Sequence, residues 1–528
     1  ECLSQYLFFG NDEYTEATAG WVLVLITRLD QCLASIREKP TKAWYALAAP
    51  CLRALCKLVE VNELALDQVH LQTQTFLSTI FGLMQSSLAS MEAAVATAPV
   101  DERFVEWIRE TTIFAARTLH SALDENEQLA SSVQKDAMEP WSGEQLLSRL
   151  PELAQLHITG SLVTLYQLAP TQWQTLLPNA VNCLTRFLIV DPTELQTLEQ
   201  NYREAKQLWH TQKEDDELEQ EIIKKVQARR EPARSIARRQ KANPREDKAT
   251  MEDQRDGRQA MEDALVAWNG VMLPIQVALE ITANLLSCLI QEEDEMAVEK
   301  DDSMDQTLRG GLVAAKLTER CLQMLQAVCN YQHEQSDENE VLKEDMEDCT
   351  SKVSGCLVNC TLGGVMLEAE VMPSWQILRQ YANKKGVCST MVVMTQQNAS
   401  LRELLCQDVE LFAGLVQSQD GEVQRDGVCL LTAALSGPTP VEIVAKVTAE
   451  MIRLLNDGLT ASVKVEVLNG FMNLYGDDDF HPQVFDDLKV LGAIQQSLVS
   501  LPKTELDPVE GEILFNASRF VAYKLGRQ

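Results

Sequence analysis

The sequence predicts an all-α protein built from stacked pairs of helices, and three observations support this. Apolar residues recur at helical spacing in one stretch of helical length after another. Strand signals are nearly absent, because the only β-like run, Met391–Met394, is too short to build a sheet. A unit of helix, turn and helix recurs near the C-terminus with a period of 37 positions.

The first part of the chain reads as a series of amphipathic helices separated by prolines. The expected helices are Trp21–Ile36, Ala43–Val61, Leu64–Met91, Phe104–Leu123, Glu152–Leu168 and Gln172–Val190. The prolines that separate the later segments are Pro140, Pro151, Pro170, Pro178 and Pro192. We expect these prolines at turns or in first helical turns, where a missing N–H costs little. Two further helices, Val271–Ile290 and Leu312–Cys329, are followed by acidic loops.

The length and net charge of the chain limit its domain organisation and the kinds of partner it can bind. A chain of 528 residues is too long for one compact core, which leaves several domains or one elongated repeat array. The net charge of −32 repels nucleic acid phosphates and favours a cationic protein as partner. No signal peptide is visible, and the apolar windows Trp21–Ile26 and Val271–Ile290 are too short or too interrupted to span a bilayer. We therefore expect a soluble intracellular protein without a membrane partner.

The chain starts at Glu1 without an initiator Met, so we also expect further sequence before it. The fourteen cysteines fit a reducing compartment, because most lie among apolar residues at helical positions and no Cys-x-x-Cys pair occurs. The six histidines are scattered, so we expect no metal site. Phosphate-binding, dinucleotide-binding, zinc-protease and nucleophile-elbow motifs are all missing, so we expect no cofactor and no enzymatic activity. A catalytic Cys paired with a distant His stays open, although nothing selects one.

A charged segment from Leu198 to Glu262 interrupts the apolar periodicity. Its first part is acidic, with Glu214, Asp215, Asp216, Glu217, Glu219 and Glu221. Its second part is basic and includes Lys224, Lys225, Arg229, Arg230, Arg238, Arg239 and Lys241. Such a polar segment cannot bury enough apolar surface to offset its ordering entropy, so we expect it to project as a helix or loop. We interpret the basic run as part of a charged helix that pairs with the preceding acids at i, i+4 spacing, with a nuclear localisation signal or an RNA contact as the alternative.

The C-terminal repeat defines the expected architecture. Asp420-Gly421 can be laid over Asp457-Gly458, and the apolar residues that follow also correspond. These apolar pairs are Val428 with Val465, Leu430 with Val467, Leu431 with Leu468, and Ala434 with Phe471. The period is typical of helical-pair repeats, and the tetratricopeptide pattern is missing. We therefore predict an α-solenoid of armadillo- or HEAT-like repeats, with an N-terminal part at 1–197, the charged insertion at 198–262 and C-terminal repeats at 263–528.

Three segments also carry a family resemblance. The helix QVALEITANL at Gln276–Leu285 follows the long charged insertion, Val463–Asp479 ends in YGDDD, and the chain closes with NASRFVAY at Asn516–Tyr523. In order and spacing these segments resemble the symportins, the HEAT/armadillo chaperones of ribosomal proteins. The resemblance covers roughly Pro192 to the end, whereas the N-terminal third is similar only in being helical. The basic run departs from the strongly acidic loop of that family.

The resemblance implies a dedicated carrier that is not an enzyme. It would bind the two large-subunit ribosomal proteins associated with 5S rRNA, bring them into the nucleus through an import receptor and deliver them for assembly of the 5S particle and the 60S subunit. It would meet 5S rRNA only indirectly, act as a monomer and occur in cytoplasm, nucleus and nucleolus. In the family, one cargo is held by the acidic loop and the other places a terminal peptide in the solenoid groove. The acids between Glu214 and Glu221 are accordingly the expected cargo-binding residues.

Two other binding roles stay open: a general armadillo- or HEAT-repeat scaffold and a nuclear transport adaptor. Import adaptors of the armadillo type display ladders of Trp and Asn in successive repeats. The eight tryptophans of this chain fall at irregular spacing without an accompanying Asn, which argues against that adaptor. A cationic ribosomal protein would be masked by an acidic, curved surface through salt-sensitive contacts.

Overall fold

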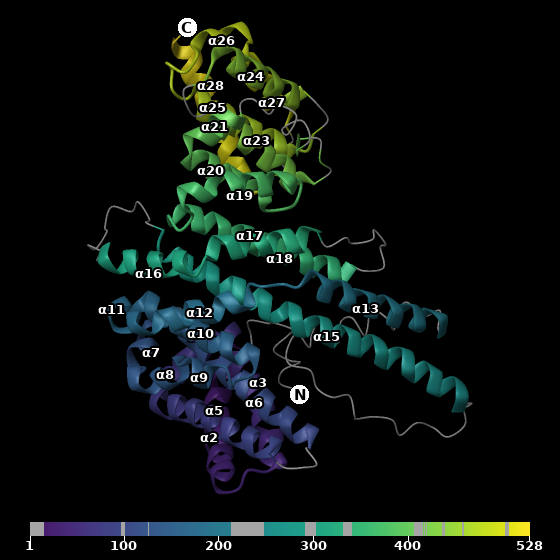
Figure 1. The fold of residues 1–528 in the computed structure, drawn as a ribbon. Helices are drawn as coiled ribbons and strands as arrows, with labels where there is room; N and C mark the ends of the chain where they lie inside the picture. The colour runs from purple at the N-terminus through teal and green to yellow at the C-terminus, as the bar shows by residue number, and fades with distance from the viewer. Residues whose placement is uncertain are drawn as a thin grey trace. The chain divides into compact units, whose positions relative to one another are not determined.

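A computed structural model describes the chain at 15–96, 101–124, 126–212, 248–290, 302–330, 340–405, 415–416, 418, 420–435, 439–456, 459–501 and 506–527. Helices dominate these residues and no strand occurs among them, which confirms the all-α prediction for the described part of the chain (Figure 1). The described residues divide into two compact units. The first is built mainly from α2 to α16 and the second mainly from α17 to α28.

The first unit stacks four long helices in series. Its elements are α2 (Thr15–Glu38), α3 (Lys42–Val61), α4 (Glu63–Leu71), α5 (Thr73–Val95), α6 (Glu102–Leu123), α7 (Glu127–Ser132), α8 (Lys135–Ser142), α9 (Glu144–Leu147), α10 (Glu152–Leu168), α11 (Pro170–Trp173), the 3-10 helix η2 (Gln174–Leu176), α12 (Leu177–Phe187), α13 (Pro192–Gln212), α15 (Lys248–Ser287) and α16 (Asp302–Ala314). Helix α3 packs on α6, α6 on α10, and α10 on α15. Every residue of α10 from Ala154 to Tyr166 is buried, so this helix forms the centre of the unit.

The helices α13 and α15 lie side by side and extend into both ends of the charged segment (Figure 1). Residues 198–212 belong to α13 and residues 248–262 to α15, and the side chains of Tyr202 and Trp268 are buried. Only residues 213–247 of the segment lie outside the described residues. The description of 198–262 as a projecting insertion therefore stays a prediction, while its two ends are helical.

The second unit also stacks helices that are not neighbours in sequence. Its elements are α17 (Leu317–Asn330), α18 (Glu340–Leu362), α19 (Glu368–Gln380), α20 (Val387–Gln397), α21 (Ala399–Leu405), α23 (Gly421–Leu435), α24 (Val441–Asn456), α25 (Ala461–Tyr475), α26 (Pro482–Asp487), α27 (Val490–Ser500) and α28 (Pro508–Arg527). Helix α20 packs on α23, α23 on α25, and α25 on α28 (Figure 1). The eight apolar residues that define the predicted repeat are all buried in α23 and α25. The Asp457-Gly458 turn lies outside the described residues.

Several predicted elements need correction. The expected helix Leu64–Met91 is interrupted at Gln72, and Leu312–Cys329 is interrupted at Lys316, whose φ of 55° is left-handed and cannot continue a helix. The β-like run Met391–Met394 lies inside α20, where tertiary packing outweighs the strand preference of its valines. Pro140 lies inside α8 rather than at a turn or in a first helical turn.

Two helices are long and apolar enough to cross a membrane by length and composition, α2 over Ala19–Glu38 and α15 over Gln259–Ser287. Both are longer than the apolar windows that the sequence suggested. Helix α2 packs on α3, α4 and α5, and α15 packs on α10, α12 and α13. A core helix passes the same test of length and composition, so these two helices are weak evidence for a membrane span.

We predict that Gly160→Ala destabilises the first unit, because Gly160 lets α10 approach α6. A Cβ at this position would meet ring atoms of His120 at 2.4 Å, and that ring also contacts His157, so moving it away would disturb the histidine pair. The expected loss is about 2 kcal/mol, measured by chemical unfolding. Gly270→Ala is the matched control, because nothing lies within 4 Å of the added Cβ, and it should stabilise by about 0.5 kcal/mol. Equal stability of the two variants would contradict this account of the contact.

Candidate functional site

The charged residues singled out in the sequence lie outside the described residues. All six acids between Glu214 and Glu221 and all seven bases between Lys224 and Lys241 belong to 213–247. Their roles in binding cargo, an import receptor or RNA therefore stay predictions. The described residues bring together a different set of acids, on helices that lie one repeat apart in the second unit.

Polar contacts connect α20, α23 and α25 at a constant sequence separation. The Ser389 hydroxyl of α20 donates to Asp426 Oδ2 of α23 at 2.6 Å, and the two residues are 37 positions apart. The Cys429 thiol of α23 donates to Glu466 Oε1 of α25 at 3.3 Å, again across 37 positions. We call Glu422, Asp426 and Glu466 the acidic row. This separation of 37 positions equals the period of the predicted repeat.

Two glycines allow close contacts here: Gly470 lets α25 approach α23, and Gly427 leaves space for Leu415, which precedes α23. A Cβ at Gly427 of α23 would lie 2.9 Å from Leu415 Cβ, and a Cβ at Gly470 of α25 would lie 2.7 Å from Thr432 Oγ1 of α23. The apolar faces of both helices are buried in the same contacts. Because the buried apolar residues fix the rotation of each helix, Asp426 of α23 and Glu466 of α25 lie at the partly buried edge of the helix contacts.

The acidic row has little compensating positive charge. Lys385 Nζ lies 2.9 Å from Glu422 Oε2, but both side chains are about half exposed, so this ion pair contributes little. Neither Asp426 nor Glu466 forms an ion pair with a described residue. Burial raises the pKa of Asp426, and Glu422 and Glu466 raise it further against the Ser389 hydrogen bond and Arg425. The row is therefore a place where an added cation would be stabilised.

The first unit contains a second polar row, on α3 and α6, in which the acids are paired. Arg117 Nε donates to Glu60 Oε1 at 2.8 Å, and Lys57 Nζ lies 3.0 Å from Glu60 Oε2. Burial favours the neutral Glu60 carboxyl, but Arg117 and Lys57 outweigh it and hold its pKa below the usual value. Arg53 Nη2 lies 3.5 Å from Glu110 Oε2. The Arg117–Glu60 and Arg53–Glu110 pairs join α3 to α6, and we interpret this row as structural.

Two histidines continue the structural row toward α10. His120 Nδ1 of α6 lies 3.4 Å from His157 Nδ1 of α10, so one ring nitrogen can donate to the other. Burial lowers the pKa of His120 to about 4, and burial together with His120 places the pKa of His157 well below its usual value. Both rings are thus neutral at pH 7. No group of three or more His, Cys, Asp or Glu side chains within the described ranges is placed to hold a metal ion.

The acidic row was missed in the sequence, although a signal for it was present. Asp426 and Glu466 are single acids within apolar helices, and the longer charge runs were more conspicuous. Applying the 37-residue period places Ser389 over Asp426 and Cys429 over Glu466. Polar residues that coincide in this way mark positions where adjacent repeats share a polar contact.

No family model matches the sequence, and no curated protein is similar to it.

We predict that the histidine pair makes the first unit sensitive to acid. Because the pKa of His120 is about 4 in the folded chain and about 6.5 when unfolded, protons bind preferentially to the unfolded chain between these values. This contribution to stability is fully present above pH 6.5 and is lost as the pH falls toward 4. Replacing both residues, His120→Gln with His157→Asn, should flatten the decline by about 1 kcal/mol per histidine between pH 6.5 and pH 5.5 in chemical unfolding. An unchanged pH slope would contradict the assignment.

We predict that removing the charge of Asp426 stabilises the second unit. Its pKa is raised in the folded chain, so ionisation costs stability as the pH rises through the folded pKa, and the penalty persists at pH 7. Asp426→Asn should raise Tm by about 2 °C at pH 7, since Asn can still accept from Ser389. Glu442→Gln, which removes an exposed acid of α24 outside the acidic row, is the control and should leave Tm within about 1 °C. A lower Tm for Asp426→Asn would show that the buried carboxylate is stabilising.

Proposed function

We propose that this chain is a non-enzymatic carrier of cationic proteins, organised as an α-solenoid of armadillo- or HEAT-like repeats. Support for the solenoid comes from two series of stacked helices, α3, α6, α10 and α15 in the first unit and α20, α23, α25 and α28 in the second. Further support comes from the 37-residue separation of the contacts between successive helices. Neighbouring repeats of such proteins bury each other's apolar faces and leave one extended surface for binding.

The observation that carries the binding role is the acidic row. Asp426 and Glu466 are held at partly buried positions without an ion pair among the described residues, in a chain whose net charge is −32. A Lys or Arg side chain placed there would offset the repulsion between these carboxylates. Partly buried charges are also less screened by salt than exposed ones, so added salt would weaken this contact less than it weakens surface pairs.

The specific cargo follows from the family resemblance. We propose that the chain binds the two ribosomal proteins associated with 5S rRNA and delivers them to the nucleus for assembly of the 5S particle and the 60S subunit. The acids between Glu214 and Glu221 would hold one cargo, and the acidic row would receive a basic peptide of the other. A broader scaffold for basic proteins is the second candidate, because the acidic row would suit many cationic segments.

We predict that the two cargo proteins depend on different parts of the chain. Helices α13 and α15 pack on each other, so deleting 213–247 and joining the ends by a Gly/Ser linker spares both helices. Quantitative pull-down from lysate should recover both 5S-associated proteins with the intact chain and lose one with this deletion. The double variant Asp426→Asn with Glu466→Gln should reduce recovery of the second cargo protein about tenfold. This corresponds to a loss of about 1.4 kcal/mol of binding free energy.

The matched control for the double variant is Glu442→Gln with Glu450→Gln on α24, which removes the same charge outside the acidic row. Raising the ionic strength from about 0.1 M to about 1 M shortens the Debye length from about 10 Å to about 3 Å and should weaken both interactions. Recovery of many unrelated basic proteins would favour the scaffold. Recovery of no basic protein by the intact chain would overturn both candidates.

A further inference from the structure

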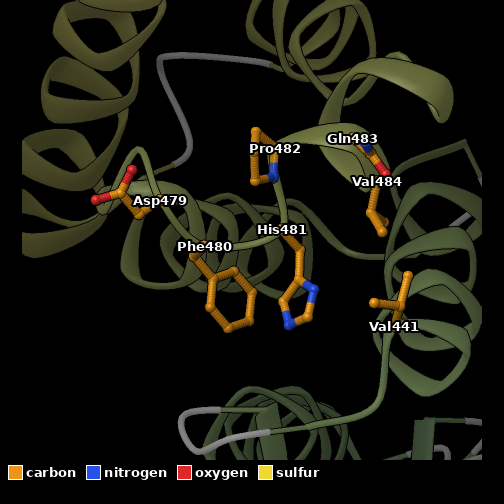
Figure 2. A pocket seen from close by; sticks show the side chains of 7 residues that line it. All are labelled: Val441, Asp479, Phe480, His481, Pro482, Gln483 and Val484. Atoms are coloured by element: carbon orange, nitrogen blue, oxygen red, sulfur yellow. The ribbon is translucent and has the colours of Figure 1, made fainter.

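An open hollow in the second unit is not part of the acidic row. It is lined by Val441, at the start of α24, and by residues 479–484, which lead from α25 into α26, and its volume is about 450 Å³. Figure 2 shows the rings of Phe480 and His481 extending in the same direction, with Val441 and Val484 facing each other beyond His481. The Asp479 carboxylate lies on the other side of Phe480, at the edge of the lining (Figure 2).

The walls of the hollow are held in place before any ligand binds. The Phe480 ring lies edge-on to Tyr475 at 5.5 Å and to His481 at 4.8 Å. Tyr475 is itself buried, and its hydroxyl lies 2.6 Å from Thr448 Oγ1. The Asp479 N–H donates to Asp477 Oδ1 at 2.9 Å, which fixes the chain before the hollow. Preformed walls reduce the ordering cost of binding.

The charge around the hollow identifies the kind of ligand. Residues 477–487 contain five aspartates and no Lys or Arg. Asp478 is engaged by Lys524 Nζ at 2.6 Å and by the Tyr523 hydroxyl at 2.8 Å. Asp479 is exposed and forms no ion pair with a described residue. A hollow that combines two valines and an aromatic ring with polar groups and a carboxylate at its edge suits a side chain that is apolar along its stem and cationic at its end.

We propose that this hollow binds an arginine side chain from a cationic segment of a partner protein. The methylene groups would lie against Val441 and Val484, and the guanidinium would lie over the Phe480 ring and reach the Asp479 carboxylate. Arginine fits better than lysine, because its planar guanidinium stacks on aromatic rings and pairs with both oxygens of a carboxylate. The inference rests on the proposed function in one respect only, that the partner is cationic.

The test measures, by fluorescence anisotropy, the affinity of the full chain for a fluorescent peptide. The peptide carries four arginines separated by Gly-Ser pairs. Two matched peptides carry lysine or the neutral isostere citrulline at the same positions. We expect the arginine peptide to bind tightest and the citrulline peptide at least tenfold more weakly. Asp479→Asn should weaken arginine binding about tenfold, the loss of one charged pair of about 1.4 kcal/mol. It should leave citrulline binding unchanged.

Two further variants separate the hollow from the general charge of the protein. Asp487→Asn removes the same charge from an exposed position outside the lining, and it should change the affinity less than twofold. Phe480→Leu keeps an apolar side chain but removes the aromatic face, and it should weaken arginine binding about fivefold with Tm within a few degrees of the parent. Equal losses for Asp479→Asn and Asp487→Asn, or tighter binding of the citrulline peptide, would overturn the proposal.

The failure of this inference can be distinguished from the failure of the proposed function. If the arginine peptide binds the parent chain and the Asp479→Asn variant equally, the hollow is not the site, while cationic partners remain supported. If Asp479 and Phe480 prove necessary but the 5S-associated proteins are not recovered from lysate, the hollow stands and the cargo assignment is wrong.

Discussion

Close packing of α20 on α23 and of α23 on α25 is the constraint on which the second unit depends. Helices α23 and α25 approach closely at Gly470, where a Cβ would lie 2.7 Å from Thr432 Oγ1 of α23, and Gly427 leaves space for Leu415 on another side of α23. Burial of their apolar faces then fixes how each helix is rotated. Because the distance between the two helices and their rotation are fixed, the positions of the polar residues at the edge of the contact are fixed as well. Asp426 and Glu466 therefore lie on the same side of the helix stack.

The two units use the same kind of packing with different charge balance. In the first unit, Arg117 and Lys57 satisfy Glu60, and the histidine pair is neutral, so polar residues between stacked helices hold the helices together. In the second unit, Asp426 has a hydroxyl partner, two acidic neighbours and one nearby cation, Arg425, and burial still raises its pKa. A partly buried carboxylate without an ion-pair partner costs stability. Such a cost is expected where the missing cation is supplied by a partner, which is why the second unit is the better candidate for binding.

Much of the fold could be predicted from the sequence, because helical periodicity is a local signal. Glu152–Leu168 was predicted with the bounds that α10 has, and Ala43–Val61 differs from α3 by one residue. The interruptions at Gln72 and Lys316 escaped prediction because the apolar pattern continues through them. Met391–Met394 was ambiguous because strand propensity and burial in a helical stack favour the same residues.

The candidate site was harder to predict, because it depends on contacts between helices that are far apart in sequence. The repeat period was visible in the apolar residues from Val428 to Ala434, yet it was not applied to the polar ones. A single acid such as Asp426 carries no local signal of its surroundings. The hollow beside Phe480 had still less signal, since its lining joins the start of α24 to the chain that leads into α26.

The central claim, that Asp426 lies where a cationic partner binds, can be tested by proton release. Binding of a cation near a carboxylate with a raised pKa lowers that pKa, so a proton leaves the protein when the complex forms. Isothermal titration calorimetry at mildly acidic pH, with a Lys/Arg-rich peptide in two buffers of different ionisation enthalpy, measures this release. We expect proton release with the parent chain and its loss with Asp426→Asn. Equal release from both proteins, or none from the parent chain, would contradict the account.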